Sequence, residues 1–319
     1  MSKSAHIVFM GTPDFALGVL QLLIEKHYHV VGVVSTPDKP AGRGLEKQSS
    51  AVSLYARSQN ISLAQPTSLK DPAFLAQLRE WNADLYIVVA FRMIPKEVWS
   101  LPRLGTFNLH ASLLPQYRGA APINWALING ETVTGVTTFL IDHQIDTGHI
   151  LFQESISVLP DDNAGTLHDR LMTLGANIVC RTIDALTSGN AHPVPQPSVT
   201  PLHPAPKLGK ELCCINWDQE PRQICRLIRG LSPYPAAFCL LQTSTQELVP
   251  IKVYHAIPIE ASHTHPFGTI LCDNKSYLHV ACRNGFISLL YLQVAGKKRM
   301  TIKEFLPGFR NHQALFVSP

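Results

Sequence analysis

The chain has 319 residues, of which 45% are hydrophobic and 16% are charged, so it carries enough apolar side chains for more than one core. No apolar stretch reaches the ~18 residues that a membrane helix requires, and the run after Lys3 is too short for a signal sequence. Residues 1–206 hold 14 basic and 16 acidic side chains, whereas residues 207–319 hold 13 and 7. We therefore expect a cytoplasmic protein of two domains, the second suited to an anionic partner.

The cysteines and histidines indicate neither a disulfide framework nor a metal site. The seven cysteines form no C-x-x-C pair, and their odd number argues against a full set of disulfides. The 14 histidines show no zinc-finger spacing with them. We expect reduced thiols and no metal.

Taken in chain order, the first half alternates short apolar runs with amphipathic stretches, which is typical of a parallel α/β sheet. The runs expected to form strands are residues 6–10, 30–35, 85–89, 106–110 and 136–141. The stretches expected to form helices are residues 15–25, 72–81 and 122–129. Asp161 and Asp162 could cap a further long helix that reaches residue 186.

The composition changes after residue 189. Six prolines between residues 193 and 206 are too dense for a helix or a central strand, so residues 190–209 are expected to be an extended, semi-rigid linker. A helix is then expected at residues 221–230. It is followed by strand-like runs at residues 251–256, 269–271, 277–281 and 286–294. This succession predicts a small β-barrel.

Two polar side chains interrupt the otherwise apolar strand 106–110. Because strand side chains alternate, Asn108 and His110 share one face. Ligands of open α/β sheets bind beyond the carboxyl ends of the strands, and these residues fall there. Asp146 follows the next expected strand, at a turn. The alternative is a structural asparagine, a core histidine and an ordinary turn aspartate.

Asparagine, histidine and aspartate together suit acyl transfer to an amine. An amide such as that of Asn108 can stabilise a developing oxyanion, and such a donor is worth roughly 100–1000-fold in rate. His110 can donate a proton, which contributes about 100–10,000-fold. Asp146 could favour the protonated imidazole and relay a proton through water. No serine or cysteine nucleophile motif is evident, which favours direct attack by the amine of the substrate.

The same residues carry a family resemblance. Residues 108–115 read N-L-H-A-S-L-L-P and residues 146–148 read D-T-G. They resemble the N-x-H-x-S-L-L-P and D-x-G motifs of the folate formyltransferases. Residues 9–16, 40–44 and 118–123, together with motifs in the tail, are similar to the methionyl-tRNA formyltransferases, so the resemblance covers nearly the whole chain.

The resemblance implies an activity and a domain plan. The activity is transfer of the formyl group of 10-formyltetrahydrofolate to the α-amine of methionine on initiator tRNA, with Asn108, His110 and Asp146 as the catalytic trio. The plan is a Rossmann-like formyltransferase domain at 1–189, the linker at 190–209 and an OB-like, tRNA-binding domain at 210–319. A monomer without membrane attachment is expected.

The resemblance also implies two sets of binding residues. The folate contacts would be Ser112, Leu113, Leu114, Pro115, Phe91, Arg92 and Ile94, where Arg92 replaces the usual glycine of the family. The tRNA contacts would be Arg43, Lys207, Lys210, Lys297, Lys298 and Arg299.

Three other functions are weighed against this one. A formyltransferase for a small amine would keep the trio, but it would need neither the basic tail nor the Gly42-Arg43-Gly44 loop. A nicotinamide oxidoreductase is disfavoured because the first turn lacks G-x-G-x-x-G. A non-catalytic RNA-binding protein would leave the trio unexplained.

Overall fold

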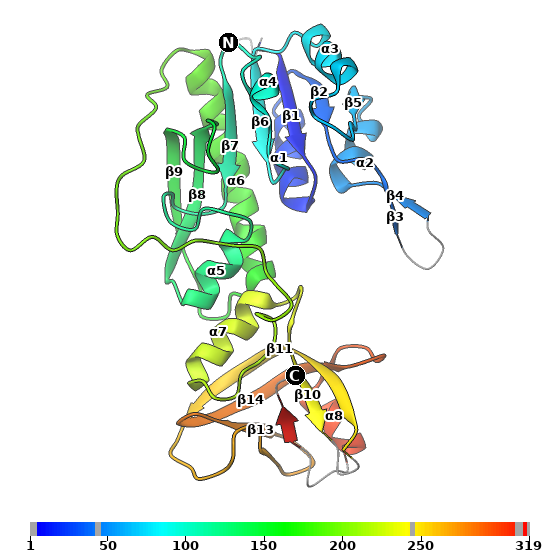
Figure 1. Cartoon of the computed structure of the whole chain (residues 1–319), viewed down its shortest axis with the longest axis vertical. Coiled ribbons are helices and arrows are strands. Elements are labelled where there is room, and N and C mark those ends of the chain that lie inside the picture. Colours follow the sequence, from blue (N-terminus) through cyan, green and yellow to red (C-terminus); the bar gives the residue numbers. More distant parts are fainter. Residues whose placement is uncertain (1–4, 42–45, 243–245, 310–314, 318–319) are drawn as a thin grey trace. The chain divides into compact units, whose positions relative to one another are not determined.

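The computed structural model describes residues 5–41, 46–242, 246–309 and 315–317. The chain divides into two compact units (Figure 1). The first unit comprises Met1–Pro122, Val133–Ser157 and His168–Ala205. The second comprises Ile123–Thr132, Val158–Leu167 and Pro206–Pro319.

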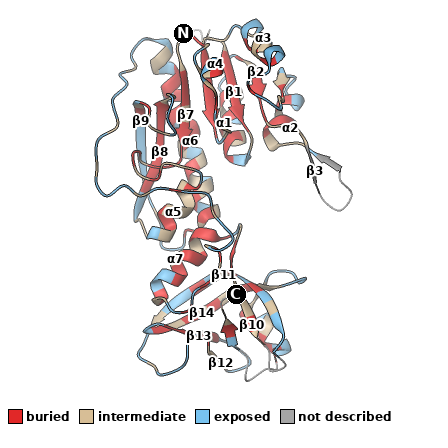
Figure 2. Cartoon of the chain, in the orientation of Figure 1, coloured by how far each residue is buried: buried red, intermediate tan, exposed pale blue. Residues whose placement is uncertain are grey.

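A seven-stranded mixed sheet in the order β5-β2-β1-β6-β7-β8-β9 forms the first unit. The parallel strands are β1 (Ile7–Gly11), β2 (Val30–Val34), β5 (Leu63–Ala64), β6 (Leu85–Val89) and β7 (Thr106–His110). The antiparallel strands are β8 (Val133–Leu140) and β9 (Ile150–Ser157). Every residue of β1 and β6 is buried, as expected for strands covered on both faces (Figure 2).

The expected α/β sheet is confirmed, but the direction of one strand is not. Residues 136–141 were expected to join a parallel sheet, and they form part of β8, which runs antiparallel to β7. The chain leaves β7 at its carboxyl end and enters β8 at that same end, since His110 pairs with Thr137 and Phe107 with Leu140. No crossover to the far end of the sheet is needed, so the two strands run in opposite directions.

Helices accompany this sheet along the chain. They are α1 (Asp14–Glu25), α2 (Ala51–Ser58), α3 (Pro72–Glu80), α4 (Lys96–Trp99) and the long α6 (Ala164–Thr187). Asp71 caps α3 by accepting a hydrogen bond from the Ala73 amide. The expected cap of α6 was wrong by one residue. Asn163 Oδ1 accepts from the Gly165 and Thr166 amides, whereas Asp162 is engaged by the Leu159 amide.

The second unit contains a nearly closed antiparallel barrel. Its path is β12 (Ile270–Cys272), β13 (Leu278–Cys282), β14 (Gly285–Val294), β11 (Leu248–Glu260), β10 (Ala237–Gln242) and β16 (Leu315–Val317). A bridge between Thr269 and Leu315 brings the two ends of this path together. The short β15 (Met300–Thr301) pairs with β14 and leads into α8 (Ile302–Phe305). The expected barrel is thus confirmed, although β10 and β16 were not anticipated.

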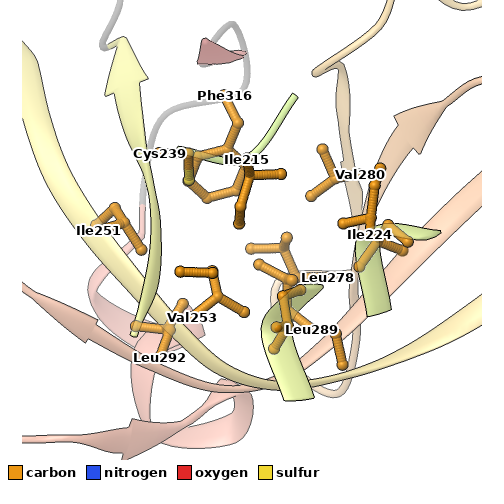
Figure 3. Packing of buried hydrophobic residues seen from close by; sticks show 14 of the residues in the cluster. Ile215, Ile224, Cys239, Ile251, Val253, Leu278, Val280, Leu289, Leu292 and Phe316 are labelled. Carbon is orange, nitrogen blue, oxygen red and sulfur yellow. The ribbon is translucent and has the colours of Figure 1, made fainter. Parts of the chain in front are cut away.

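Apolar side chains from many strands fill the interior of the barrel. Ile215, Val253, Leu289 and Leu292 converge there (Figure 3) and are at most 1% exposed. The helices α5 (Pro122–Asn129) and α7 (Pro221–Leu231) belong to the same unit, and the Asn124 side chain of α5 donates to the Gly230 carbonyl of α7. Among the described residues, no helix combines the length and apolarity that crossing a membrane would require.

Candidate active site

Strand β7 positions Asn108 and His110. Asn108 is half-buried and pairs in register with Val88 of β6 and Phe139 of β8. His110 ends the strand and is 6% exposed. Lying two residues apart on one strand, the two side chains share a face, as the sequence predicted.

The two ring nitrogens of His110 have different surroundings. Nε2 lies 2.8 Å from the carbonyl oxygen of Tyr117. A carbonyl can only accept, so Nε2 carries a proton and donates it. Nδ1 lies 3.7 Å from Oδ2 of Asp146, with the two side chains 7% and 13% exposed. The geometry therefore leaves Nδ1, on the Asp146 side, as the nitrogen that can exchange a proton.

Asp146 is held in an uncommon backbone conformation. Its φ of 56° lies in the left-handed region, which few residues other than glycine adopt. Its Oδ2 accepts a hydrogen bond of 2.9 Å from the Gly119 amide. Two residues later, a Cβ on Gly148 would lie 1.7 Å from the Leu140 carbonyl oxygen, so only glycine fits this close approach. The glycine of the D-T-G sequence is thus required by the turn itself.

Asp146 reaches His110 by a return path, because the antiparallel strand β8 carries the chain away from His110. Strand β8 ends at Leu140 beside Phe107, near the amino end of β7. Asp146 is nevertheless next to His110 at the carboxyl end of β7. Residues 141–146 therefore lead from the Thr106 carbonyl, which the Ile141 amide binds, back to His110. The sequence placed Asp146 at a turn but did not show this return path.

The S-L-L-P segment forms a tightly bonded turn after β7. The Ser112 hydroxyl is fully buried and donates to the Gln116 carbonyl over 2.6 Å. The Leu114 carbonyl accepts from Gln153 Nε2 over 2.7 Å, and the Leu114 amide donates to Thr137 Oγ1. Leu114 and Pro115 are buried, while Leu113 is half-buried. Ser112 thus shapes the turn through its side chain.

Arg92, which stands where the family usually has glycine, is tied to the neighbouring loop. Its guanidinium donates to the carbonyl oxygens of Thr67 and Pro66, and its Cζ lies 5.6 Å from the centre of the Phe91 ring. Burial lowers the pKa of this guanidinium below its usual value. Ile94, nearby in the chain, is 8% exposed. Arg92 therefore joins residues 91–94 to residues 66–67.

The basic residues expected to contact tRNA are exposed wherever the structure describes them. They are Lys207, Lys210, Lys297, Lys298 and Arg299. The Arg299 guanidinium carbon lies 3.5 Å from the centre of the Tyr254 ring, so that residue has a cation–π contact within the barrel. Arg43 lies outside the described residues, between β3 (Lys39–Ala41) and β4 (Glu46–Gln48).

Two of the arginines of α7 are bound by other groups of the second unit. Arg222 forms an ion pair of 2.6 Å with Glu260, and Arg229 donates to the carbonyls of Asp162 and Leu159. Burial lowers the pKa of Arg229. Both arginines and Arg226 line a groove of about 690 Å³ in the second unit.

One polar residue beside the trio was missed by the sequence analysis. Gln196 lies in the proline-rich segment, and its Nε2 donates to the carbonyls of Asp146 and Gly148 over 2.8 and 3.0 Å. Its Oε1 accepts from the Arg118 guanidinium. The only hint in the sequence was a single glutamine between Pro195 and Pro197. Among the described residues, no three His, Cys, Asp or Glu side chains gather as a metal site would need.

Comparison with known proteins places the chain in a family. A formyl transferase model matches residues 3–183, and a model of the formyl transferase C-terminal domain matches residues 207–310. A methionyl-tRNA formyltransferase of Bacteroides thetaiotaomicron is 52% identical over 311 residues, which cover 97% of each chain. One from Flavobacterium johnsoniae is 53% identical over 306 residues, covering 96% of each. The chain belongs to the methionyl-tRNA formyltransferase family.

This formyltransferase shares its fold with more distant structures. The sugar 3N-formyl transferase WlaRD has a TM-score of 0.64 at 18% identity, with 92% of this chain and 99% of that chain covered. HypX from Aquifex aeolicus, solved with tetrahydrofolic acid, has a TM-score of 0.63 at 18% identity. The chain covers 47% of HypX.

Proposed function

We propose that the chain transfers the formyl group of 10-formyltetrahydrofolate to the α-amine of methionine on initiator tRNA, for translation initiation. The observation that carries this proposal is the His110–Asp146 pair beside Asn108, at the carboxyl end of a central strand. Relatives about half identical over nearly their whole length bear the name of this activity. Because the chain belongs to this family, formyl transfer is the reaction that this arrangement would catalyse.

In the proposed mechanism the amine attacks the formyl carbon directly, and Asn108 and His110 stabilise the oxygen that becomes negative. The Asn108 amide donates to that oxygen, and an oriented donor of this kind gains strength as the charge develops. His110 supplies a proton from Nδ1, because Nε2 is already bonded to the Tyr117 carbonyl. The bond from the formyl carbon to the folate nitrogen then breaks as the oxygen regains its double bond, and that nitrogen takes the Nδ1 proton of His110.

Asp146 acts on the proton that the attacking amine must lose. Its carboxylate is 3.7 Å from His110 Nδ1, which is longer than a direct hydrogen bond. A water molecule or a small closure on substrate binding would complete the connection. The Gly119 amide fixes the carboxylate oxygen that faces the ring. Asp146 therefore accepts the amine proton and favours the charged imidazole.

The substrate contacts form part of the same proposal. Folate would lie against residues 112–115 with Phe91, Arg92 and Ile94. HypX, which shares this fold, was solved with tetrahydrofolic acid. The tRNA would meet Arg43 and the exposed cations Lys207, Lys210, Lys297, Lys298 and Arg299. The domain limits 1–189, 190–209 and 210–319, and a monomeric state, belong to this proposal as well.

The test is a transfer of labelled formyl. The purified chain is incubated with 10-formyltetrahydrofolate labelled in the formyl group and with initiator tRNA charged with methionine. Uncharged initiator tRNA, free methionine and an amino-sugar nucleotide serve as matched acceptors. Label on the charged tRNA alone supports the proposal. Label on a small amine and none on tRNA would refute it.

A further inference from the structure

We infer that Gln196 is a positioning residue for the His110–Asp146 pair, and that the proline-rich segment around it fastens the site rather than merely joining two domains. This inference rests on the proposed role of the pair. Gln196 lies 50 residues from Asp146 in the chain, yet its side chain contacts the backbone on both sides of Thr147.

Gln196 supports the turn that carries Asp146. The left-handed φ of Asp146 is a sparsely populated conformation, and such conformations persist only where the surroundings over-determine them. The Gln196 amide donates to the carbonyl of Asp146 itself and to that of Gly148. These two bonds fix the peptide planes that directly follow Asp146 and Gly148. They therefore fix the direction in which the Asp146 side chain leaves the backbone.

Gln196 also supports the loop that contacts both members of the pair. Gln196 Oε1 accepts from Arg118. The residue before Arg118 is Tyr117, whose carbonyl binds His110 Nε2. The residue after it is Gly119, whose amide binds Asp146 Oδ2. One side-chain amide thus links the turn of Asp146 to the loop that orients His110.

The backbone of the same segment supports this loop from another side. The Tyr117 amide donates to the His203 carbonyl over 2.7 Å, and the Ala205 amide donates to the Arg118 carbonyl over 2.8 Å. Further upstream, Val194 and Ile150 exchange both of their backbone hydrogen bonds. Residues 194–205 are therefore bonded to the first unit near both ends, with Gln196 between these attachments.

The chemistry of a primary amide is required at this position. Gln196 donates to two carbonyl oxygens and accepts from a guanidinium at the same time. A glutamate of the same size could still accept from Arg118, but it would turn a carboxylate toward the two carbonyls. The turn of Asp146 would then shift, and misplacement by about 1 Å can cost on the order of 100-fold in rate.

The experiment compares Gln196→Glu with Asn124→Asp. The Asn124 amide also donates to a backbone carbonyl, that of Gly230, and it belongs to the second unit. Both substitutions replace such a donor by a carboxylate. For Gln196→Glu we expect kcat to fall by about 10–100-fold, with KM for tRNA and for 10-formyltetrahydrofolate changed less than about threefold. Asn124→Asp should leave kcat within about twofold, whatever it does to the melting temperature.

A second arm separates positioning from stability. In the Asp146→Ala background, measured by single turnover with excess enzyme, Gln196→Glu should lower the rate by less than about threefold, because groups that act as a unit are not additive. Full multiplication of the two effects would overturn the inference, as would a kcat of Gln196→Glu within twofold of the wild type. If His110→Ala and Asp146→Ala themselves kept normal activity, the proposed function of the pair would fail instead, and that result is distinct from these two.

Discussion

The side chains of the candidate active site and the basic side chains of the second unit differ in how firmly the structure holds them. His110 and Asp146 are almost buried. The Tyr117 carbonyl binds His110, and the Gly119 amide binds Asp146. Lys207, Lys297 and Lys298 are exposed on the surface. Proton transfer needs atoms placed within fractions of an ångström, whereas attraction of phosphates needs only charge. Substitutions in the first group should lower kcat, and those in the second should weaken tRNA binding.

The largest effect is expected for the catalytic pair. His110→Ala and Asp146→Ala should each lower kcat by at least ~100-fold, and the double variant should lose little more than the worse single variant. The control is His29→Ala, which removes an exposed histidine of the first unit. Steady-state kinetics and melting temperature are measured for each variant. A His110→Ala enzyme that kept more than about a tenth of kcat would contradict the assignment, given the ~100-fold minimum for acid–base help.

A core substitution in the barrel should give the opposite result, a loss of stability without a loss of chemistry. Leu292 is fully buried, and Leu292→Ala should lower the unfolding free energy of the barrel by about 2–5 kcal/mol. Leu248→Ala is the matched control, because Leu248 is 51% exposed. Denaturant unfolding measures the difference, and kcat at 25 °C should stay unchanged. Equal unfolding curves for the two variants would show that the barrel interior is not packed as described.

The Arg43→Ala variant tests whether the loop between β3 and β4 binds tRNA. Removing one charged hydrogen-bonding group costs about 1.5–3 kcal/mol, so Arg43→Ala should raise KM for tRNA by roughly tenfold or more. Folate binding should be unaffected. Both are measured by formylation at limiting tRNA and by folate titration. Equal activity of Arg43→Ala and wild type at limiting tRNA would remove Arg43 from the proposed contacts.

The smallest effect is expected for the exposed lysines. If Lys297 and Lys298 neutralise phosphates, removing them should make the plot of log K for tRNA against log salt concentration less steep. The slope should decrease by roughly 0.7–0.9 for each phosphate contact that is lost. Tight-binding titrations of Lys297→Ala/Lys298→Ala at several salt concentrations give this slope. The Lys26→Ala variant, with an exposed lysine in the first unit, is the control. An unchanged slope and affinity would show that this pair does not touch RNA.

The sequence predicted the elements that show a strong local pattern. Strand β7 and its polar face could be recognised because Asn108 and His110 interrupt a buried apolar run. Helices α5 and α7 were recognisable from a proline at the start and a glycine near the end. The barrel followed from the runs that form β11, β12, β13 and β14. Strand β10 was missed although it has six residues, and the short β16 carries too few to show a pattern.

Features that depend on distant contacts could not be predicted. Alternation of apolar residues does not encode strand direction, so β8 was expected to be parallel. The cap of α6 was wrong because Asp161, Asp162 and Asn163 are all good capping residues, and only the backbone geometry selects one. Gln196 was missed because its partners are 50 residues away, and a glutamine among prolines gives no local signal.

The two margins of the seven-stranded sheet limit unwanted self-association. A free strand edge offers unpaired amides and carbonyls to another molecule. On one margin, β5 is only two residues long. At the other edge, Ile150 of β9 already exchanges two backbone hydrogen bonds with Val194, and the Arg170 guanidinium donates to the Ser157 carbonyl. Gln153, Glu154 and Ser155 between them are exposed and polar. Neither edge therefore presents a long apolar template, so edge-to-edge aggregation is disfavoured.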